Sequence, residues 1–404
     1  MFLYNSLTQQ KENFIPLENQ KVKMYVCGIT PYDTTHLGHA FTYTIFDILR
    51  RYLKHKDYSV QYTQNVTDID DDILRKAKEI NCHSREGGNP QITTWKELGD
   101  FWTGKFLKDL DSLNIALPDN YVKATDSIST IIIIIRGLID KGFAYEKEGN
   151  IYFNIAKDPR YGQLSHFSQQ QMILLSKERG ADPNDPRKIN PLDFILWQKS
   201  LPDEPYFESP FSKGRPGWHI ECSAMNYKYL GPQIDIHGGG RDLIFPHHES
   251  EIAQTENFTG QKPFSKYWMH TSMLMYRGEK MSKSLGNLVM VSDLLKKYSA
   301  NAIRYMFLSH HYRTPWEFQP EELEKAETAI SLIKKALEGE SERENNQPVG
   351  QPELKEFETS MNDDLNTPNV LTNIDSLAEK LNKKPDTEAN QTLNKMVNIL
   401  GFKF

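Results

Sequence analysis

The sequence predicts an α/β fold: a doubly wound parallel sheet with an inserted connective domain and a C-terminal α-helical bundle. An apolar strand over 22–29 is followed by a turn and a helix over 37–54, and a second strand over 59–65 comes next. This strand–helix–strand order is typical of a parallel, Rossmann-type sheet with helices on both faces. From Pro320 onward the apolar residues recur only at helical spacing, which predicts the bundle.

The first half of the chain indicates where a ligand should bind. The second strand runs into Val66-Thr67-Asp68-Ile69-Asp70-Asp71, and the apolar spacing then predicts a helix over 73–80. Residues 81–90 are rich in turn-forming residues and lack periodicity, so we expect a surface loop there. Ligands of doubly wound sheets bind at the carboxyl ends of the strands, which places the expected site after residues 29 and 65.

The middle of the chain, residues 117–205, changes character and predicts the inserted domain. A helix is expected over 127–141 and a hairpin over 145–154, and a tract rich in Pro, Asp and Asn follows at 181–191. Strand-type residues resume at 234–237. The sheet domain is therefore expected in two halves, one on each side of the insertion.

Two apolar stripes at helical spacing support the C-terminal bundle. They run over 323–337 and 371–381, and each needs an apolar partner. A Thr-Pro pair at 367–368 marks a helix start, because proline is favoured in the first helical turn. The segment between the stripes, 339–352, is polar and is expected to be a linker.

The composition is that of a globular protein of two or three domains. The 404 residues are 38% hydrophobic and 25% charged, far from the composition of disordered chains. The longest apolar cluster, 131–135, is too short to cross a membrane, and residues 1–6 lack the features of a signal peptide. We therefore expect a cytoplasmic protein with no membrane segment. The net charge of −6 leaves RNA binding by a local basic face undecided.

Two short motifs far apart in the sequence together predict an ATP site. His36-Leu37-Gly38-His39 opens the first helix, where free backbone N–H groups and the helix dipole favour phosphate. Lys280-Met281-Ser282-Lys283-Ser284 carries two ammonium groups, which suit a triphosphate and the charge that develops on leaving pyrophosphate. Alone, each motif also fits a simpler interpretation, a helix start with surface histidines or a solvated basic loop. Their order and spacing favour the joint site.

A second set of residues predicts a metal site. Cys27 ends the first strand, Cys222 lies far along the chain, and His247 and Glu251 are four residues apart on one helix face. Two thiolates, an imidazole and a carboxylate are ordinary zinc ligands. The third cysteine, Cys82, is distant, so a disulfide framework is not expected. The spacing alone leaves open that both cysteines are small core residues and that the His-His-Glu cluster caps a helix.

Nearly the whole chain resembles one family. The two ATP motifs resemble the HIGH and KMSKS pair of class I aminoacyl-tRNA synthetases, and within that class the chain resembles the cysteinyl-tRNA synthetases. The matching segments, in order and spacing, are 25–30, 65–71, 215–225, 235–251 and 279–287. The resemblance implies a cysteine–tRNA ligase. Such an enzyme activates L-cysteine with ATP and Mg²⁺ to cysteinyl-adenylate and pyrophosphate, and transfers cysteine to the 3′ end of tRNA(Cys).

The resemblance also implies a domain order. We expect a monomer with a Rossmann catalytic domain in two halves (1–116 and 206–270), a connective insertion (117–205), a KMSKS loop and stem-contact region (271–319), and a helical bundle on the tRNA/anticodon side (320–404).

The four candidate metal ligands are implied to hold one Zn²⁺ per chain, on which the substrate binds as a thiolate. Cysteine and serine are nearly isosteric, but only the thiol ionises readily on a soft metal ion, so coordination separates them where shape does not. Thr67 is expected to hydrogen-bond the amino acid. Trp218 is expected to form a flat apolar wall, and a core aromatic is its alternative.

The resemblance implies the remaining contacts with ATP. His36 and His39 are expected to contact the phosphates, and Lys283 to stabilise the charge of the transition state. The Gly238-Gly239-Gly240 run lets backbone approach the nucleotide, and Asp242 is expected to accept hydrogen bonds from the ribose hydroxyls. The implied catalytic groups are His36, His39, Lys280 and Lys283.

Two alternatives remain open. Compared with the bacterial enzymes it resembles, the chain has a shortened C-terminus, which fits a cysteine:amino-sugar ligase of the mycothiol type. Against this stand segment 362–368, which resembles the tRNA enzymes, and a composition leaning to Lys, Ile and Asn. The other alternative is a non-catalytic zinc- and nucleotide-binding relative, which the intact ATP motifs disfavour.

Overall fold

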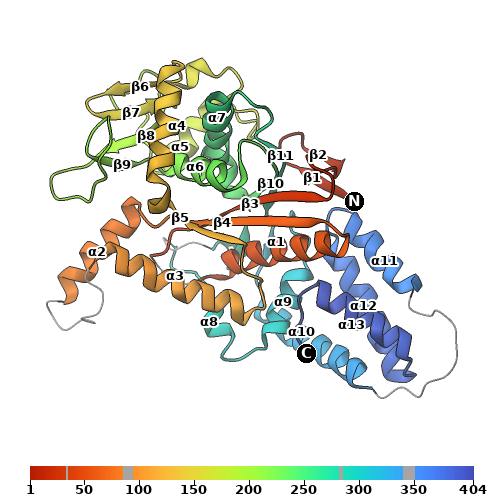
Figure 1. The fold of residues 1–404 in the computed structure, drawn as a ribbon. Coiled ribbons are helices and arrows are strands. Elements are labelled where there is room, and N and C mark those ends of the chain that lie inside the picture. Colours follow the sequence, from red (N-terminus) through yellow and green to blue (C-terminus); the bar gives the residue numbers. More distant parts are fainter. Residues whose placement is uncertain (33–34, 85–93, 282–284, 340–350) are drawn as a thin grey trace.

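The computed structural model describes residues 1–32, 35–84, 94–281, 285–339 and 351–404. Its centre is a five-stranded sheet in the order β11-β10-β3-β4-β5, in which all neighbours are parallel (Figure 1). The strands are β3 (Lys21–Ile29), β4 (Ser59–Val66), β5 (Asn120–Lys123), β10 (Ile234–Gly240) and β11 (Ser265–Thr271).

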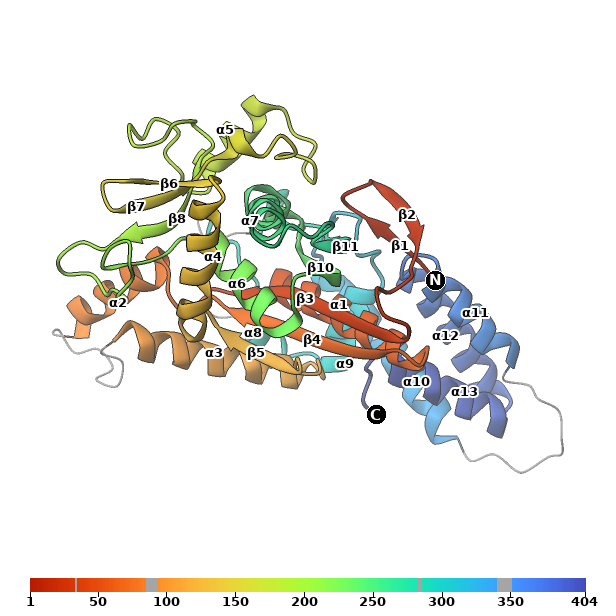
Figure 2. The same cartoon turned by 45° about the horizontal axis from the view of Figure 1, so that its top comes forward.

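Helices cover both faces of this sheet. One face carries α1 and α3, and the other carries α6 and α7 (Figures 1 and 2). Their bounds are α1 (Leu37–His55), α3 (Trp95–Ser112), α6 (Trp218–Leu230) and α7 (Glu249–Thr259). The predicted doubly wound parallel sheet is therefore confirmed.

Helix α2 (Asp71–Ser84) is longer than predicted at both ends. Its first turn carries Asp71 and Asp72, which the positive end of a helix dipole favours. The helix continues past the expected end at residue 80, because extending a formed helix costs little. The loop predicted over 81–90 is thus wrong for 81–84, and residues 85–90 lie outside the described residues.

A four-stranded antiparallel sheet stands above the central sheet, and its core is shared with α6 and α7 (Figure 1). Its strands are β6 (Ala144–Lys147), β7 (Asn150–Phe153), β8 (Phe194–Lys199) and β9 (Gly214–Pro216), and its helices are α4 (Ile128–Asp140) and α5 (Gln169–Glu178). The predicted helix and hairpin are both present. Within the apolar cluster 131–135, Ile131, Ile134 and Ile135 are buried in this core, as an amphipathic helix requires.

Short elements connect the large ones. They are η1 (Ala124–Ser127), η2 (Ile155–Lys157), η3 (Arg241–Leu243), η4 (Ile244–His248), β12 (Leu274–Tyr276), β13 (Glu279–Lys280), β14 (Trp316–Glu317), α8 (Val291–Leu294) and α9 (Ala300–Leu308). Strands β13, β12 and β14 form a small sheet beside the central one.

The C-terminal helices form the predicted bundle. They are α10 (Pro320–Glu338), α11 (Gln351–Asn362), α12 (Thr367–Lys383) and α13 (Thr387–Ile399). The two apolar stripes lie in one core with the central sheet, which joins the bundle to the half of the molecule that contains this sheet. An N-terminal hairpin of β1 (Phe2–Asn5) and β2 (Gln10–Asn13) lies between this bundle and β11 (Figure 2).

Among the described residues, we find no helix whose length and apolar character would let it cross a membrane.

Candidate active site and metal centre

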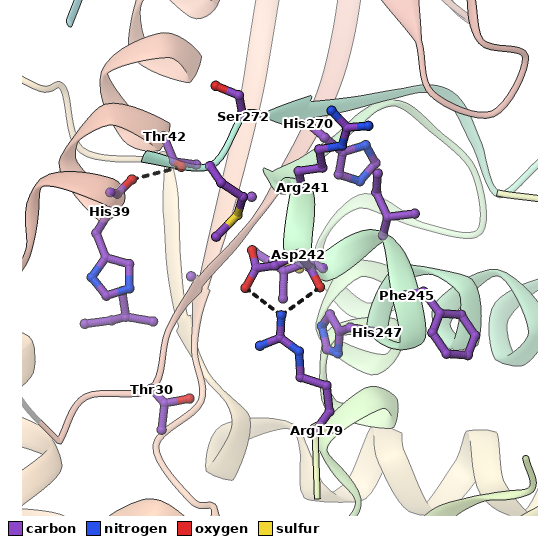
Figure 3. Close-up of a pocket in the computed structure, with 18 of the residues that line it drawn as sticks. Thr30, His39, Thr42, Arg179, Arg241, Asp242, Phe245, His247, His270 and Ser272 are labelled. Carbon is purple, nitrogen blue, oxygen red and sulfur yellow. Dashed lines mark hydrogen bonds and ion pairs between the residues drawn. The ribbon is translucent and has the colours of Figure 1, made fainter. Parts of the chain in front are cut away.

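A cavity of about 1100 Å³ opens at the carboxyl ends of the central strands, where the sequence predicts the site. Most of the predicted site residues line it. They are Cys27, His36, His39, Thr67, Trp218, Cys222, Gly240, Asp242, His247 and Lys280. Figure 3 shows part of the cavity, with His39 and His247 on opposite sides of it.

The ends of β3 and β4 approach each other closely at Gly28. A Cβ atom on Gly28 would lie 1.6 Å from the carbonyl oxygen of Asn65, so only glycine fits. The Gly28 N–H donates to Asn65 Oδ1 at 2.7 Å, and Asn65 Nδ2 donates to Thr67 Oγ1 at 3.3 Å. These contacts, with the Thr67 N–H donating to the Ile29 carbonyl at 3.0 Å, fix Thr67 in the cavity wall. Sequence reasoning missed Gly28 and Asn65 as positioning residues.

The four candidate metal ligands converge from four elements. Cys27 comes from β3, Cys222 from α6, and His247 and Glu251 from η4 and the first turn of α7. One ligand atom from each lies within 4.8 Å of all the others. Cys27 Sγ is 3.9 Å from Cys222 Sγ and 3.6 Å from Glu251 Oε1, and His247 Nε2 is 3.2 Å from the same oxygen. The structure thus brings together residues separated by up to 224 positions.

Burial sets the charge state of this cluster. All four side chains are buried, and burial raises the pKa of Cys27 and of Glu251 well above their usual values. Burial also lowers the pKa of His247 well below its usual value, so the imidazole is neutral, as a metal ligand must be. A bound cation would supply the charge that favours the thiolate and carboxylate forms. Cys, His and Glu side chains are ordinary zinc ligands, so the donor set fits Zn²⁺.

Three further histidines support the cluster. His237 Nε2 is 3.0 Å from Glu251 Oε2, and His248 Nε2 is 3.3 Å from Cys27 Sγ. His248 Nδ1 is in turn 2.8 Å from His270 Nε2. Cys27, His237, His248 and Glu251 form a second possible ligand set that shares Cys27 and Glu251 with the first. Sequence reasoning assigned these histidines no role.

Trp218 lies against the cluster instead of deep in a core. Its ring stacks on His247 with centroids 4.5 Å apart, and its exposed part faces the cavity. His219 Nδ1 lies 3.0 Å from His247 Nδ1, which helps to fix the orientation of the His247 ring. The cavity next to the cluster is thus walled by a flat aromatic surface.

The other end of the cavity carries the first predicted ATP motif and the described part of the second, Lys280 and Met281. His36 caps α1, its Nδ1 accepting from the Gly38 N–H at 3.1 Å, and its ring stacks on His39 with centroids 3.8 Å apart. Lys280 lies in β13, directly after a turn in which Arg277 and Gly278 both have positive φ angles. Its side chain is exposed and lines the cavity. Lys283 lies outside the described residues.

The three glycines of the run at 238–240 have different surroundings. A Cβ atom on Gly238 would lie 2.2 Å from the Phe46 ring of α1, and one on Gly239 would lie 2.9 Å from Leu243. Both glycines therefore have a packing reason to be small, and among the described residues only Gly240 of the run lines the cavity. Asp242 also lines it. Its carboxylate forms an ion pair with the Arg179 guanidinium at 3.1 Å (Figure 3). Sequence reasoning missed Arg179.

Two family models match the chain. The model described as tRNA synthetases class I (C) catalytic domain matches residues 13–328, and the model described as DALR domain matches residues 356–404. The cysteine–tRNA ligase of Dehalococcoides mccartyi is 45% identical to this chain over 99% of it and 86% of the relative. The cysteine–tRNA ligase of Pyrococcus furiosus is 45% identical over 96% of this chain and 81% of the relative.

Solved structures share the fold at low sequence identity. The methionyl-tRNA synthetase of Mycobacterium tuberculosis in complex with methionyl-adenylate matches with a TM-score of 0.64 and 16% identity, over 94% of this chain and 88% of that one. A putative arginyl tRNA synthetase of Campylobacter jejuni matches with a TM-score of 0.60 and 16% identity, over 95% of this chain and 91% of that one.

Proposed function

This chain belongs to the cysteine–tRNA ligases, a family of class I aminoacyl-tRNA synthetases, and on that premise we propose how its cavity performs the reaction. The activity is the ATP-dependent joining of cysteine to tRNA. A carboxylate oxygen of cysteine attacks the α-phosphorus of ATP, and pyrophosphate leaves. A hydroxyl of the terminal adenosine of tRNA(Cys) then attacks the carbonyl carbon of cysteinyl-adenylate, and AMP leaves.

The cysteine end of the cavity selects the amino acid. Cys27, Cys222, His247 and Glu251 hold one Zn²⁺ per chain in this proposal. When bound, Zn²⁺ supplies a soft Lewis acid that takes a thiol as thiolate at neutral pH and binds the serine hydroxyl poorly. Thr67, fixed by Asn65, orients the amino acid by a hydrogen bond.

The ATP end stabilises developing charge. The positive dipole end at the start of α1, with His36 and His39, binds phosphate oxygens together with Mg²⁺. Lys280 and Lys283 neutralise the charge that moves onto pyrophosphate as the bond to the α-phosphorus breaks. Asp242 accepts from the ribose hydroxyls, and Gly240 lets the backbone approach the nucleotide.

The remaining parts of the proposal concern the whole chain. The enzyme acts as a cytoplasmic monomer, with the connective insertion at 117–205 and the bundle from 320 on the tRNA side. The observation that supports the proposal is that three of the four candidate metal ligands, Cys27, Cys222 and His247, line the same cavity as His36, His39 and Lys280.

Charging of total bacterial tRNA with labelled cysteine tests the proposed function. Labelled serine and an amino-sugar acceptor run in parallel as controls. We expect cysteinyl-tRNA, no seryl-tRNA and no cysteinyl amino sugar. Pyrophosphate exchange without tRNA charging would contradict tRNA as the acceptor. Formation of a cysteinyl amino sugar would show that the acceptor is the amino sugar instead.

A further inference from the structure

The segment after α11 places one buried carboxylate against the catalytic half of the molecule. Asp364 has no exposed side-chain surface. Its Oδ1 accepts from the Tyr4 N–H at 2.8 Å and from the Tyr312 hydroxyl at 2.6 Å, and its Oδ2 accepts from Arg313 Nε at 2.6 Å. Both carboxylate oxygens are thus hydrogen-bonded. The sequence singles out this segment, 362–368, and the proposed reaction gives it no role.

The backbone around Asp364 is held in an unusual conformation. Asp364 and Leu365 have φ angles of 58° and 52°, in the left-handed region that residues with a side chain seldom adopt. Two such residues in succession cost free energy, which surrounding contacts must offset. A buried ion pair also contributes little net stability, because both charges lose their hydration. The arrangement is therefore better explained by what it positions than by the stability it adds.

Arg313 is the group that this arrangement positions. Ser272, directly after β11, donates from its N–H to the Tyr312 carbonyl at 2.7 Å and from its hydroxyl to the Thr314 carbonyl at 2.8 Å. The backbone on each side of Arg313 is thus anchored to the carboxyl end of the sheet. The guanidinium carbon lies 4.3 Å from the centroid of the Tyr4 ring, and Asp364 holds Nε. Backbone, aromatic face and carboxylate together fix the side chain.

The fixed guanidinium faces the catalytic cavity. Arg313 lines that cavity, and its side chain remains 31% exposed. A guanidinium has five N–H donors in a planar fork that matches phosphate oxygens, and Asp364 engages Nε. Donors therefore remain for an anion in the cavity. Phosphate is the chemistry that suits them, and both ATP and the 3′ end of an RNA carry it.

The surroundings of Arg313 favour the RNA. The ATP phosphates have the start of α1 and the Lys280 hairpin, whereas Arg313 is held by the N-terminal hairpin and the bundle, outside the central sheet. Transfer of cysteine requires the terminal nucleotide of an RNA chain to enter the same cavity from outside. We propose that Arg313 binds a phosphodiester of the acceptor end of tRNA, and that Asp364 positions Arg313 for this contact. The proposal rests on the proposed function.

Two assays on the full chain separate the two phosphate sources. Cysteine-dependent ATP–pyrophosphate exchange needs no tRNA, whereas charging needs it. We expect Arg313→Gln to raise the KM for tRNA about 10-fold, the effect of a lost hydrogen bond to a charged group, and to leave the exchange rate within about 2-fold. The slope of log KM against log salt should also fall by about 0.7, since one phosphate contact to a single strand is lost. A merely structural role would not change that slope.

The positioning role of Asp364 has its own variants. Asp364→Asn keeps the shape of the side chain and should raise the KM for tRNA by a smaller factor, about 3-fold. The double variant Asp364→Asn/Arg313→Gln should have the same KM for tRNA as Arg313→Gln alone. Arg313→Lys keeps the charge and should retain part of the salt slope. Lys11→Ala is the matched control, because Lys11 pairs with Asp363 at 2.6 Å on the exposed side of the same two segments. It should behave as wild type.

Each contrary result is distinguishable. If Arg313→Gln loses exchange as much as charging, the residue serves ATP and the proposal is wrong. If the wild type charges tRNA, and Arg313→Gln has the same KM for tRNA and the same salt slope, the proposal for Arg313 is wrong and the proposed function stands. If wild type itself exchanges pyrophosphate and charges no tRNA, both fail.

Discussion

The two ends of the cavity are built in different ways. At the end proposed to bind cysteine, four candidate ligand groups from four elements lie within 4.8 Å of one another and are buried. At the ATP end, two half-buried imidazoles start a helix, and Lys280 stands exposed on a hairpin. A metal site needs its atoms in place before the substrate arrives, whereas charge stabilisation tolerates cations that reach in from the surface. In the proposed mechanism, selectivity therefore resides in the rigid, buried end and rate in the exposed end.

The largest expected effect is at the rigid end. Cys222→Ser keeps the volume of the side chain and removes one thiolate, so we expect loss of bound zinc and a fall of at least about 10³-fold in kcat/KM for cysteine. Metal content and pyrophosphate exchange at varied cysteine concentration measure this. Cys82→Ser is the matched control and should retain both. A Cys222→Ser enzyme with full zinc and normal KM for cysteine would contradict the ligand assignment.

A smaller effect is expected at the exposed end. Lys280→Ala should slow cysteine-dependent pyrophosphate exchange about 10²-fold, because a charge-stabilising donor is lost from the transition state. Zinc content and the affinity for cysteine should stay as in wild type, since the lysine lies apart from the metal cluster. Lys283→Ala is expected to follow the same pattern. An equal loss of cysteine affinity in either variant would remove the contrast between the two ends.

Measurements of stability test whether the glycine run at 238–240 serves packing or ATP binding. Gly238→Ala should lower the free energy of unfolding by about 2 kcal/mol, because the new methyl group meets the Phe46 ring. Gly104→Ala on α3 meets open space and should raise stability by about 0.5–1 kcal/mol. Urea unfolding measures both. Unchanged stability of Gly238→Ala with weakened ATP binding would favour the ligand role that the sequence suggested over packing.

The smallest effect concerns the ion pair across the cavity. Arg179 and Asp242 are each about one-third exposed, so their pairing is weak. Arg179→Ala should change the KM for ATP by no more than about 5-fold, with kcat and zinc content unaffected. Steady-state kinetics at saturating cysteine test this. A loss of 100-fold or more would place Arg179 among the charge-stabilising groups.

The sequence predicts the parts of the site that carry local signals. His36 and His39 follow a strand and open a helix, and the pair His247 and Glu251 has helical spacing, so pattern alone suggests them. The central strands and the two apolar stripes of the bundle are also predicted, because buried strands and helix faces place apolar residues at characteristic spacings in the sequence. The end of α2 is missed, since residues 81–84 have the composition of a turn and helix propagation decides their structure.

The missed residues depend on contacts between distant segments. His237, His248 and His270 look like ordinary core histidines until β10, η4 and β11 meet. Arg313 and Asp364 are 51 positions apart, and a single arginine or aspartate carries no periodic signal. Such pairings follow from the tertiary fold, and only the structure reveals them.

The most direct test of the account compares cysteine and serine in ATP–pyrophosphate exchange, before and after removal of zinc by a chelator. The account predicts that the zinc-loaded enzyme prefers cysteine by at least about 10³-fold. It also predicts that chelation abolishes the cysteine-dependent exchange and that added zinc restores it. Full exchange by the metal-free enzyme, or similar rates with serine, would contradict it.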